Sequence, residues 1–139
     1  KYPLPKKMFG IFPTIPLKPE LPIFRGFDDV FRMPQSRHTE IRREDIERVD
    51  DLEIIAESEE SGVSIVRSRN RREFFITGHL EYAPNTLDTE YRRDLGKRDD
   101  VELPKYYYRE DNPEKGPLVT WRAHANLLFT NWLSWVVVG

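Results

Sequence analysis

The sequence has 139 residues, of which 38% are hydrophobic and 33% charged, a balance typical of a soluble, globular chain of at most one domain. Its 22 basic and 24 acidic residues give a net charge of -2, so no overall field attracts nucleic acid or an anionic membrane. Cysteine is absent, which excludes disulfides, thiolate metal sites and a cysteine nucleophile within these residues.

Targeting signals are also missing from the sequence. No apolar run approaches the about 18 residues that a membrane-spanning helix needs. The basic start, Lys1–Lys7, lacks the apolar core of a secretory signal. We therefore expect a cytoplasmic protein. Because the first residue is not methionine, we also expect the chain to be part of a longer gene product.

The first 26 residues are rich in proline. Proline fixes φ and removes an amide donor, so we expect an extended, loop-like stretch with a short strand at Lys7–Phe12. An apolar-rich run at Phe27–Met33 predicts a second strand, which runs into a turn at Pro34.

Three stronger strand signals follow. Leu52–Ala56 and Gly62–Arg67 flank the polar turn Glu57–Ser61, which predicts a hairpin. The segment Phe74–Thr77 is apolar on both faces, and continuous apolar character is typical of a central strand that is covered on both sides. Gly78 ends it.

The periodicity then becomes helical. Pro84–Leu95 predicts a helix that Gly96 terminates. A longer helix is predicted for Pro117–Val138, where apolar residues recur at three- and four-residue steps. These residues are Leu118, Trp121, Ala125, Leu128, Trp132 and Trp135. Such a stripe indicates core packing rather than a cofactor site, and it leaves a homodimer open.

Two histidines share a pattern with a glutamate, in His38-Thr39-Glu40 and His79-Leu80-Glu81. On an extended backbone, residues i and i+2 project to the same side, where a carboxylate can orient an imidazole that acts as a general base. His79 follows the predicted buried strand, and ligands bind at the carboxyl ends of strands in open α/β sheets. We therefore take His79 and Glu81 as the candidate catalytic pair. The plain alternative is a surface histidine beside an incidental neighbour.

Other chemistry has weaker support. His124 lies beside the apolar stripe and is expected to be partly buried with its hydrogen bonds satisfied. A zinc site is not expected, because the histidines lack the close spacing of metal ligands. The glycines are scattered singly and form no phosphate-binding loop. The basic run Arg67–Arg72 is explained more simply as a solvated turn than as an anion site.

Several segments, in consistent order along nearly the whole chain, resemble blocks of the homoserine O-acyltransferases. They are Met8–Gly10, Arg25–Asp29, Pro34–Glu40, Leu52–Ser58, Thr77–Tyr82, Thr120–Ala125 and Leu127–Leu133.

The resemblance implies an α/β fold similar to class I glutamine amidotransferases, with a flavodoxin-like sheet. Residues 1–139 would be the carboxy-terminal part of a single catalytic domain. It also implies a Cys–His–Glu triad and ping-pong transfer of an acetyl or succinyl group from acyl-CoA to L-homoserine, in methionine biosynthesis. By motif, His79 is the base and Glu81 its orienting partner. No cofactor is implied besides the acyl-CoA co-substrate. The cysteine would belong to an amino-terminal half absent from this sequence, so we expect the chain alone to be inactive.

The same resemblance implies a set of substrate-binding residues, namely Lys7, Ser36 and Arg93. The guanidinium fork of an arginine suits the two oxygens of the homoserine carboxylate. Without the resemblance, these residues would be a solvated lysine, a turn serine and a helix-surface arginine. Gln35 departs from the family, which usually has a histidine there. A glutamine keeps one hydrogen bond but does not titrate.

Two other classes of function remain open on the sequence alone. The chain could be a non-catalytic binding or assembly domain derived from the enzyme, in which His79 and Glu81 serve packing alone. It could also belong to a glutamine amidotransferase-like hydrolase with the same type of triad. The family blocks outside the His-Leu-Glu segment favour the acyltransferase. The sequence does not distinguish an acetyl from a succinyl donor.

Overall fold

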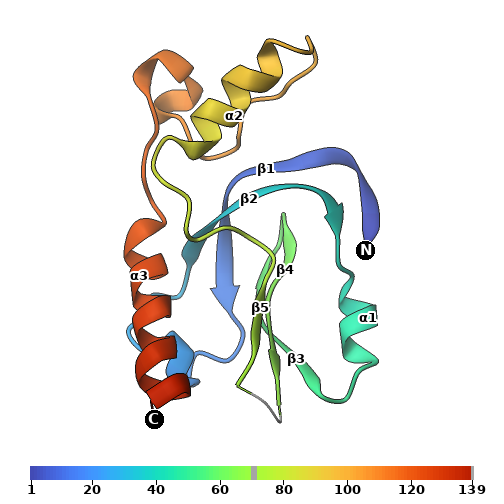
Figure 1. The fold of residues 1–139 in the computed structure, drawn as a ribbon, viewed down its shortest axis with the longest axis vertical. Helices are drawn as coiled ribbons and strands as arrows, with labels where there is room; N and C mark the ends of the chain where they lie inside the picture. Colours follow the sequence, from blue (N-terminus) through green and yellow to red (C-terminus); the bar gives the residue numbers. More distant parts are fainter. Residues whose placement is uncertain (70–71, 139) are drawn as a thin grey trace.

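A computed structural model describes residues 1–69 and 72–138, which fold as helices around one five-stranded sheet (Figure 1). The strand order is β2-β1-β3-β4-β5, with antiparallel neighbours. The strands are β1 (Tyr2–Pro16), β2 (Phe31–Glu40), β3 (Leu52–Ser58), β4 (Gly62–Ser68) and β5 (Phe74–Ile76). The helices are η1 (Pro22–Phe24), α1 (Arg43–Glu47), α2 (Thr86–Leu95), η2 (Arg109–Asp111), η3 (Pro113–Lys115), α3 (Arg122–Asn131) and the π-helical η4 (Trp132–Val138).

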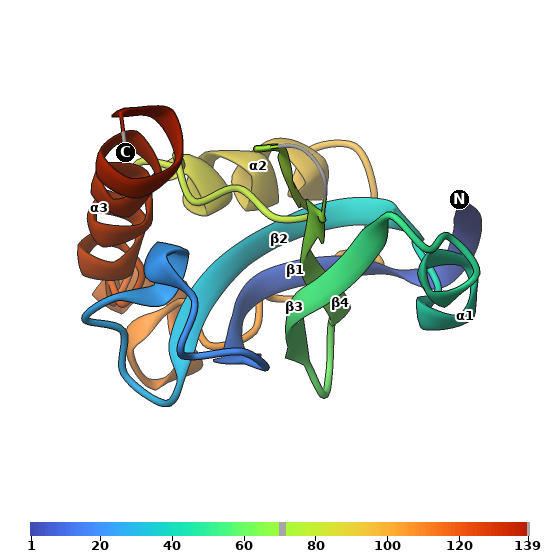
Figure 2. The ribbon, with the colours of Figure 1, turned by 90° about the horizontal axis from the view of Figure 1, so that it is seen from below.

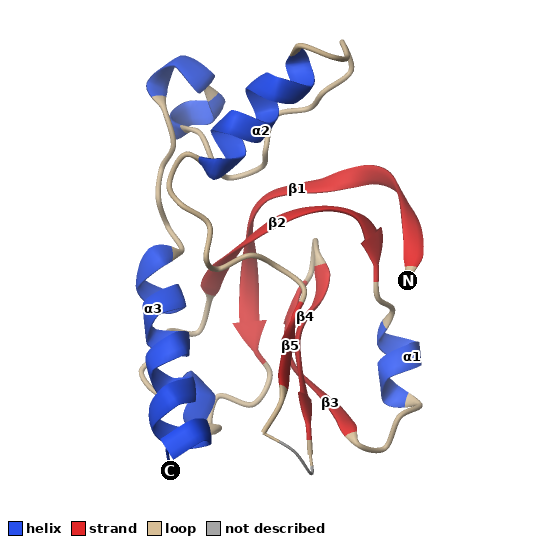
Figure 3. Ribbon diagram, in the orientation of Figure 1, coloured by secondary structure: helices blue, strands red, loops and turns tan. Residues whose placement is uncertain are grey.

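The β1–β2 pair is a long ribbon whose strands bend together (Figure 3). The prediction of a loop-like start was wrong, because β1 covers far more than the expected Lys7–Phe12. The second strand begins at Phe31 rather than at Phe27, and it continues through Pro34 instead of turning there. Proline fits an extended backbone, and β2 is an outer strand, where a missing amide donor is tolerated.

The predicted hairpin is confirmed as β3 and β4, which pair from Leu52 opposite Ser68 to Ser58 opposite Gly62. The following strand differs from its prediction. β5 pairs with β4 at the end of the sheet order, and Phe75 and Ile76 are 49% and 41% exposed. The expectation of a central strand covered on both sides was therefore wrong for the described chain. No described strand pairs with the outer edge of β5.

Both long helices are present, with later starts than expected. α2 begins at Thr86, and α3 begins at Arg122, after a segment that holds the exposed Leu118. The prediction of a single apolar stripe on one helix was also wrong. Trp121 and Leu128 belong to different core clusters, and Trp135 is exposed. Figures 1 and 2 show α3 and α1 on opposite sides of the molecule. Within the described residues, no helix is long and apolar enough to cross a membrane.

Buried side chains form three clusters. One lies against α3, with Ile23, Phe24, Phe31, Met33, Ile55, Ala56, Ile65 and Leu128. A second packs under α2, with Phe9, Ile11, Leu87, Tyr107, Tyr108 and Trp121. A third lies on the β3–β4 hairpin, with Ile54, Val63 and Val66. The second cluster matters for function, because it fixes α2 over the bent ribbon (Figure 2) and thereby positions the segment that joins β5 to α2.

Candidate active site

The segment that carries His79 is attached to β2 through its backbone. The amide of His79 donates a hydrogen bond of 2.8 Å to the carbonyl oxygen of Pro34. A Cβ atom on Gly78 would lie 2.5 Å from Cγ of Met33 and 2.6 Å from the oxygen of Pro34. Glycine is therefore required by this close approach, which sets the point where the imidazole leaves the main chain.

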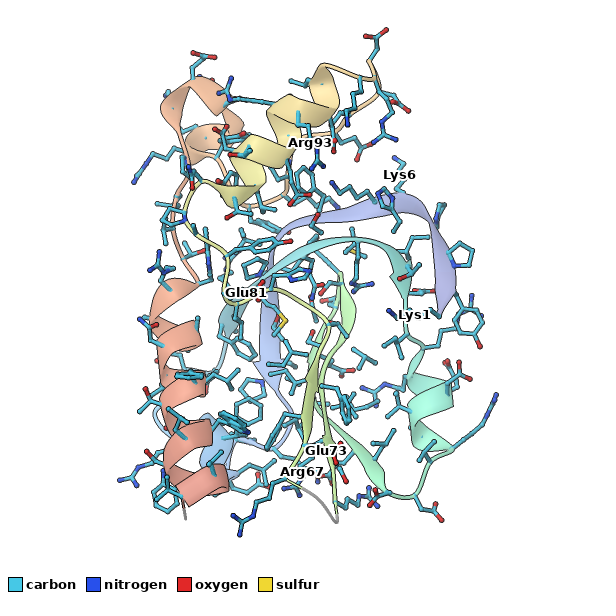
Figure 4. All side chains as sticks on the ribbon, in the orientation of Figure 1. Lys1, Lys6, Arg67, Glu73, Glu81 and Arg93 are labelled. Atoms are coloured by element: carbon cyan, nitrogen blue, oxygen red, sulfur yellow. The ribbon has the colours of Figure 1, made fainter. Side chains whose placement is uncertain are left out.

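The predicted contact between His79 and Glu81 is present, but the extended backbone expected for it is not. Leu80 and Glu81 lie in a turn, which the amide of Tyr82 closes on the carbonyl oxygen of His79 at 3.1 Å. Nδ1 of His79 lies 3.1 Å from Oε2 of Glu81, on the segment between β5 and α2 where Figure 4 labels Glu81. The two side chains are 40% and 71% exposed, so the pair is open to solvent in the described chain. Because Glu81 engages Nδ1, Nε2 is the ring nitrogen that is left for proton transfer.

Tyr82 lies against the imidazole. Its ring is stacked on His79, with 4.6 Å between the ring centroids and an interplanar angle of 3°. The carbonyl oxygen of Tyr82 accepts a hydrogen bond of 3.0 Å from Nε1 of the buried Trp121. Burial, followed by the charges of Glu90 and Glu81, raises the pKa of the Tyr82 hydroxyl.

The three predicted substrate-binding residues lie together around carboxylates of α2. Nζ of Lys7 lies 3.3 Å from both Oε1 of Glu90 and Oδ2 of Asp94. Ser36 donates a hydrogen bond of 2.7 Å to the same Glu90 oxygen. Arg93, labelled on α2 in Figure 4, lies 3.1 Å from Asp94 and 3.9 Å from Glu90. We call Lys7, Ser36, Glu90, Arg93 and Asp94 the Glu90 cluster.

The Glu90 cluster is charge-balanced, and all its charged side chains except that of Arg93, which is 54% exposed, are largely shielded from water. The side chains of Lys7, Glu90 and Asp94 are between 13% and 18% exposed. Burial alone would raise the pKa of Asp94, but hydrogen bonds from Arg93 and Lys7 outweigh it and hold that pKa below its ordinary value. Two cations thus face two carboxylates beside the stacked Tyr82.

Glu90, Asp94 and Tyr82 were not predicted as site residues from the sequence. A signal existed for the first two, because Glu90, Arg93 and Asp94 are spaced i, i+3 and i+4 and share one helix face. No comparable signal marks Tyr82, since its contact with His79 depends on a turn in which its amide bonds the His79 carbonyl at 3.1 Å.

Gln35, which the sequence comparison singled out, is fully buried. Its Nε2 donates to Oγ1 of Thr77 at 3.2 Å, and its Oε1 accepts from Nε of Arg37 at 3.0 Å. The amide therefore joins β2 to Thr77, two residues before His79.

The other His-x-Glu pattern is arranged differently. His38 is exposed on β2, and the carboxylate of Glu40 lies 3.2 Å from Nε of Arg42. The Glu40 carboxylate thus pairs with an arginine, in contrast to Glu81.

His124 is partly buried and its ring has a polar partner, as predicted. Its ring packs on Phe27 and Phe31, with ring centroids 5.0 Å and 6.0 Å apart. Its Nε2 lies 3.3 Å from Oδ2 of Asp28, and its side chain is 17% exposed. These contacts give His124 a packing role beside α3.

Metal and anion sites have little support in the described chain. Among residues 1–69 and 72–138, no group of three or more His, Cys, Asp or Glu is placed to hold a metal ion. Positions 70 and 71 of the predicted basic turn lie outside the described residues. At its start, Arg67 lies 2.7 Å from Glu53, and Arg69 lies 3.7 Å from the same carboxylate.

Two solved structures share this fold. A putative GMP synthase protein from Thermoplasma acidophilum matches with a TM-score of 0.57 at 15% identity, covering 99% of this chain and 48% of that one. SMU.1228c matches with a TM-score of 0.63 at 14% identity, covering 98% and 55%. At such identities the likeness concerns the fold alone. It confirms the predicted α/β fold, and both matches cover about half of the other chain. The five described strands pair antiparallel, in contrast to the parallel strands of the predicted flavodoxin-like sheet.

Within that fold class, the chain belongs to the homoserine O-succinyltransferase family, whose model matches residues 1–139. A homoserine O-acetyltransferase of Bacteroides thetaiotaomicron is 61% identical over 137 residues, which is 99% of this chain. Those of Phocaeicola vulgatus and Brevibacillus brevis are 62% and 57% identical over the same length. The predicted family is confirmed. The chain spans only 45% of the length of each of these relatives.

Proposed function

We propose that the parent protein transfers an acyl group from acyl-CoA to the hydroxyl of L-homoserine, by a Cys–His–Glu ping-pong mechanism, in cytoplasmic methionine biosynthesis. The observation that carries the proposal is the 3.1 Å contact between Nδ1 of His79 and Oε2 of Glu81 in a chain of this family. Glu81 fixes the tautomer that leaves Nε2 with a lone pair. The names of relatives at 57% to 62% identity favour acetyl over the succinyl of the family name.

In the first half-reaction, Nε2 of His79 takes the proton of a cysteine thiol, and the thiolate attacks the thioester carbonyl carbon of acyl-CoA. The C–S bond to CoA breaks, and the imidazolium returns a proton to the departing CoA thiolate. Glu81 stabilises the imidazolium while it exists. The cysteine has to come from the part of the enzyme outside this chain, because these residues contain none.

In the second half-reaction, the homoserine hydroxyl gives its proton to Nε2 of His79 and attacks the acyl-cysteine. The C–S bond to cysteine breaks, the acyl–oxygen bond forms, and the thiol regains its proton from the imidazolium. One base thus serves both steps, which explains why a single histidine with a fixed tautomer is sufficient.

The Glu90 cluster supplies partners for both charged groups of an amino acid. Lys7 and Arg93 suit the α-carboxylate, and the carboxylates of Glu90 and Asp94 suit the α-ammonium. Without substrate, these side chains pair with one another at 3.1 to 3.9 Å. Binding of a zwitterion would replace those internal pairs with pairs of the same kind, so no charge is left buried without a partner.

The missing part of the enzyme has a surface to occupy beside the catalytic pair. A groove of about 870 Å³ lies between β5 and α3. Residues along it include Phe75, Ile76, Leu80, Leu128, Phe129 and Trp132, and it reaches Glu81. Phe129 is 60% exposed, in addition to the exposed residues of β5. Exposed apolar surface beside an open strand edge is typical of a surface that another segment covers.

We assign this groove to the amino-terminal half of the same enzyme rather than to a second copy. The relatives are more than twice as long as this chain, so a covalently linked occupant of sufficient size is available. The groove also reaches Glu81, so a segment that fills it would stand next to the base, where the cysteine is needed.

The complete protein tests the proposal through CoA release from acetyl-CoA and homoserine. His79→Ala should lower kcat by about 10²- to 10⁴-fold, the contribution of a general base. His38→Ala is the matched control, because His38 is exposed and its neighbouring glutamate pairs with Arg42. The isolated 139 residues should release no CoA. Equal activity of H79A and parent would reject the base, and ammonia release from glutamine would favour the hydrolase instead.

A further inference from the structure

The stacked ring of Tyr82 has a role beyond packing. We propose that Tyr82 is a positioning residue, which holds the His79 imidazole in its plane and joins the base to the Glu90 cluster. This inference rests on the proposed function, because it concerns how that base is aimed. It starts from the 4.6 Å centroid separation and the interplanar angle of 3° between the two rings.

The contact of His79 with Glu81 does not fix the orientation of the imidazole plane. Glu81 contacts Nδ1, which sets the tautomer, but this carboxylate is 71% exposed on a flexible side chain. A single hydrogen bond to such a group restrains one atom of the ring and allows rotation about that contact. A flat surface against the whole imidazole restrains its tilt as well, and the Tyr82 ring is such a surface.

Tyr82 can act as a fixed surface because its backbone is anchored on the protein interior. Its carbonyl oxygen accepts the 3.0 Å hydrogen bond from Trp121, which is 1% exposed. Its side chain packs against the buried cluster under α2, which includes Phe9 and Leu87. The orientation of the solvent-exposed base is thus set by residues that are close-packed and cannot easily shift.

The hydroxyl end of Tyr82 faces the substrate side of the site. A hydrogen bond with Ser36 opposes the rise in its pKa that burial and the charges of Glu90 and Glu81 cause. Ser36 in turn donates to Glu90 at 2.7 Å. Tyr82 thus contacts the base through its ring, while its hydroxyl lies on the side of Ser36, the residue that donates to Glu90.

The two ends of Tyr82 can be removed separately. Tyr82→Phe keeps the ring and loses the hydroxyl, so it should raise KM for homoserine and leave kcat within about twofold. Tyr82→Leu removes the stacked ring, so it should lower kcat by about tenfold, the order expected for one aromatic pair. Tyr2→Phe and Tyr2→Leu are matched controls, because Tyr2 also has a hydroxyl partner, Asp45, and a ring partner, Arg42, remote from the site.

A spectroscopic readout tests the geometry without relying on activity. In the complete protein with ¹³C-labelled histidine, the ring signal of His79, assigned by its loss in His79→Gln, should be shifted upfield by the Tyr82 ring. The shift should persist in Tyr82→Phe and in both Tyr2 variants, and disappear in Tyr82→Leu. The exposed His38 provides the unshifted reference in the same spectrum.

The outcomes separate this inference from the function on which it rests. An unshifted His79 signal in the parent protein would overturn the stacking, even if Tyr82→Leu fails to fold. A tenfold loss of kcat in Tyr82→Phe with unchanged KM would overturn the division between ring and hydroxyl. Full activity of a folded Tyr82→Leu would overturn the positioning role while the acyltransferase stands. Absence of acyl transfer by the parent protein would reject the proposed function, and with it the role of His79 as the base that Tyr82 positions.

Discussion

The amide of His79 and the carbonyl oxygen of Pro34 are joined by a hydrogen bond of 2.8 Å, which attaches the candidate base to β2. That bond requires the chain to pass close to β2 at Gly78, where a Cβ atom would lie 2.5 Å from Met33 and 2.6 Å from Pro34. The position of the imidazole therefore depends on a residue without a side chain.

Gly78→Ala should lower the free energy of unfolding by about 1–3 kcal/mol, the usual cost of overpacking, and should lower kcat as well because His79 moves. Denaturant unfolding and CoA release measure the two effects. Gly96→Ala is the control, since Gly96 ends α2 with a helical φ of -70°, and a Cβ there would meet Arg93 at 3.4 Å. It should raise the free energy of unfolding by about 0.4–1 kcal/mol, because alanine fits this φ and restricts the unfolded chain. Equal stabilities of the two variants would show that the close approach at Gly78 is absent.

The neighbouring residues Lys6 and Lys7 on β1 each pair with a glutamate at a similar distance, but the two pairs differ in exposure to solvent. Lys7 pairs with Glu90 in a cluster where both side chains are less than one-fifth exposed, at 16% and 18%. Lys6, labelled on the bend of β1 in Figure 4, pairs with Glu102 at 78% and 67% exposure. The pair geometry is similar, so the comparison isolates burial and position.

If the proposed function holds, Glu90→Gln should raise KM for homoserine by about tenfold or more, because it removes the charged partner that we assign to the substrate ammonium. Glu102→Gln should leave KM and stability nearly unchanged, because an exposed pair contributes about 0–1 kcal/mol. Steady-state kinetics with varied homoserine distinguishes the two. A Glu90→Gln enzyme with unaltered KM would show that the cluster does not bind the amino acid.

Local sequence patterns predicted the features that residues close together in the sequence determine. The polar turn Glu57–Ser61 between two apolar segments predicted the β3–β4 hairpin. The spacing of two residues predicted the His79–Glu81 contact, although a turn rather than an extended backbone brings the two side chains together. The convergence of Lys7, Ser36 and Arg93 on Glu90 joins β1, β2 and α2, and no local periodicity reports such a meeting. The resemblance to a family selected those three residues, and only the fold revealed Glu90 as their shared partner.

The wrong predictions for β1 and β5 also have physical causes. Prolines in β1 predicted a loop, yet pairing with β2 along residues such as Phe9 and Ile11 outweighed the local preference. The apolar run of β5 predicted burial on both faces, whereas Phe75 is 49% exposed. An apolar run predicts that a strand is buried, but it does not identify the segment that packs against it. Within the described residues, no segment buries Phe75.

Acid should destabilise the fold through Asp88. A hydrogen bond from Tyr108, the largest cause, and further contacts with Arg92 hold the pKa of Asp88 below its ordinary value. An aspartate in the unfolded chain has a pKa of about 3.9. Because the folded-state pKa is the lower one, the stabilisation is fully present above about pH 4 and is lost as the pH falls through the folded-state pKa.

Asp88→Asn should therefore lower the free energy of unfolding at pH 7 by about 1 kcal/mol, and this deficit should shrink as the pH is lowered below about 4. Urea unfolding of parent and variant between pH 7 and pH 2 measures the difference. Asp99→Asn removes the same charge at an exposed position and should change stability at pH 7 by about 0.5 kcal/mol or less. A deficit that grows toward low pH would contradict the direction of the Asp88 shift.

The groove between β5 and α3 tests the proposal that an amino-terminal half of the enzyme packs against this chain. If the amino-terminal half covers it, Phe75→Asp in the complete protein places a charge in a buried apolar contact and should cost about 3 kcal/mol or more of unfolding free energy. Val49→Asp is the matched control, because Val49 is 45% exposed just after α1, on the opposite side of the molecule from α3 (Figure 1). It should act as an ordinary surface substitution, with a change of about 0.5 kcal/mol. Equal and small effects of both variants would mean that the groove stays open to solvent, and the cysteine would then have to reach His79 from another direction.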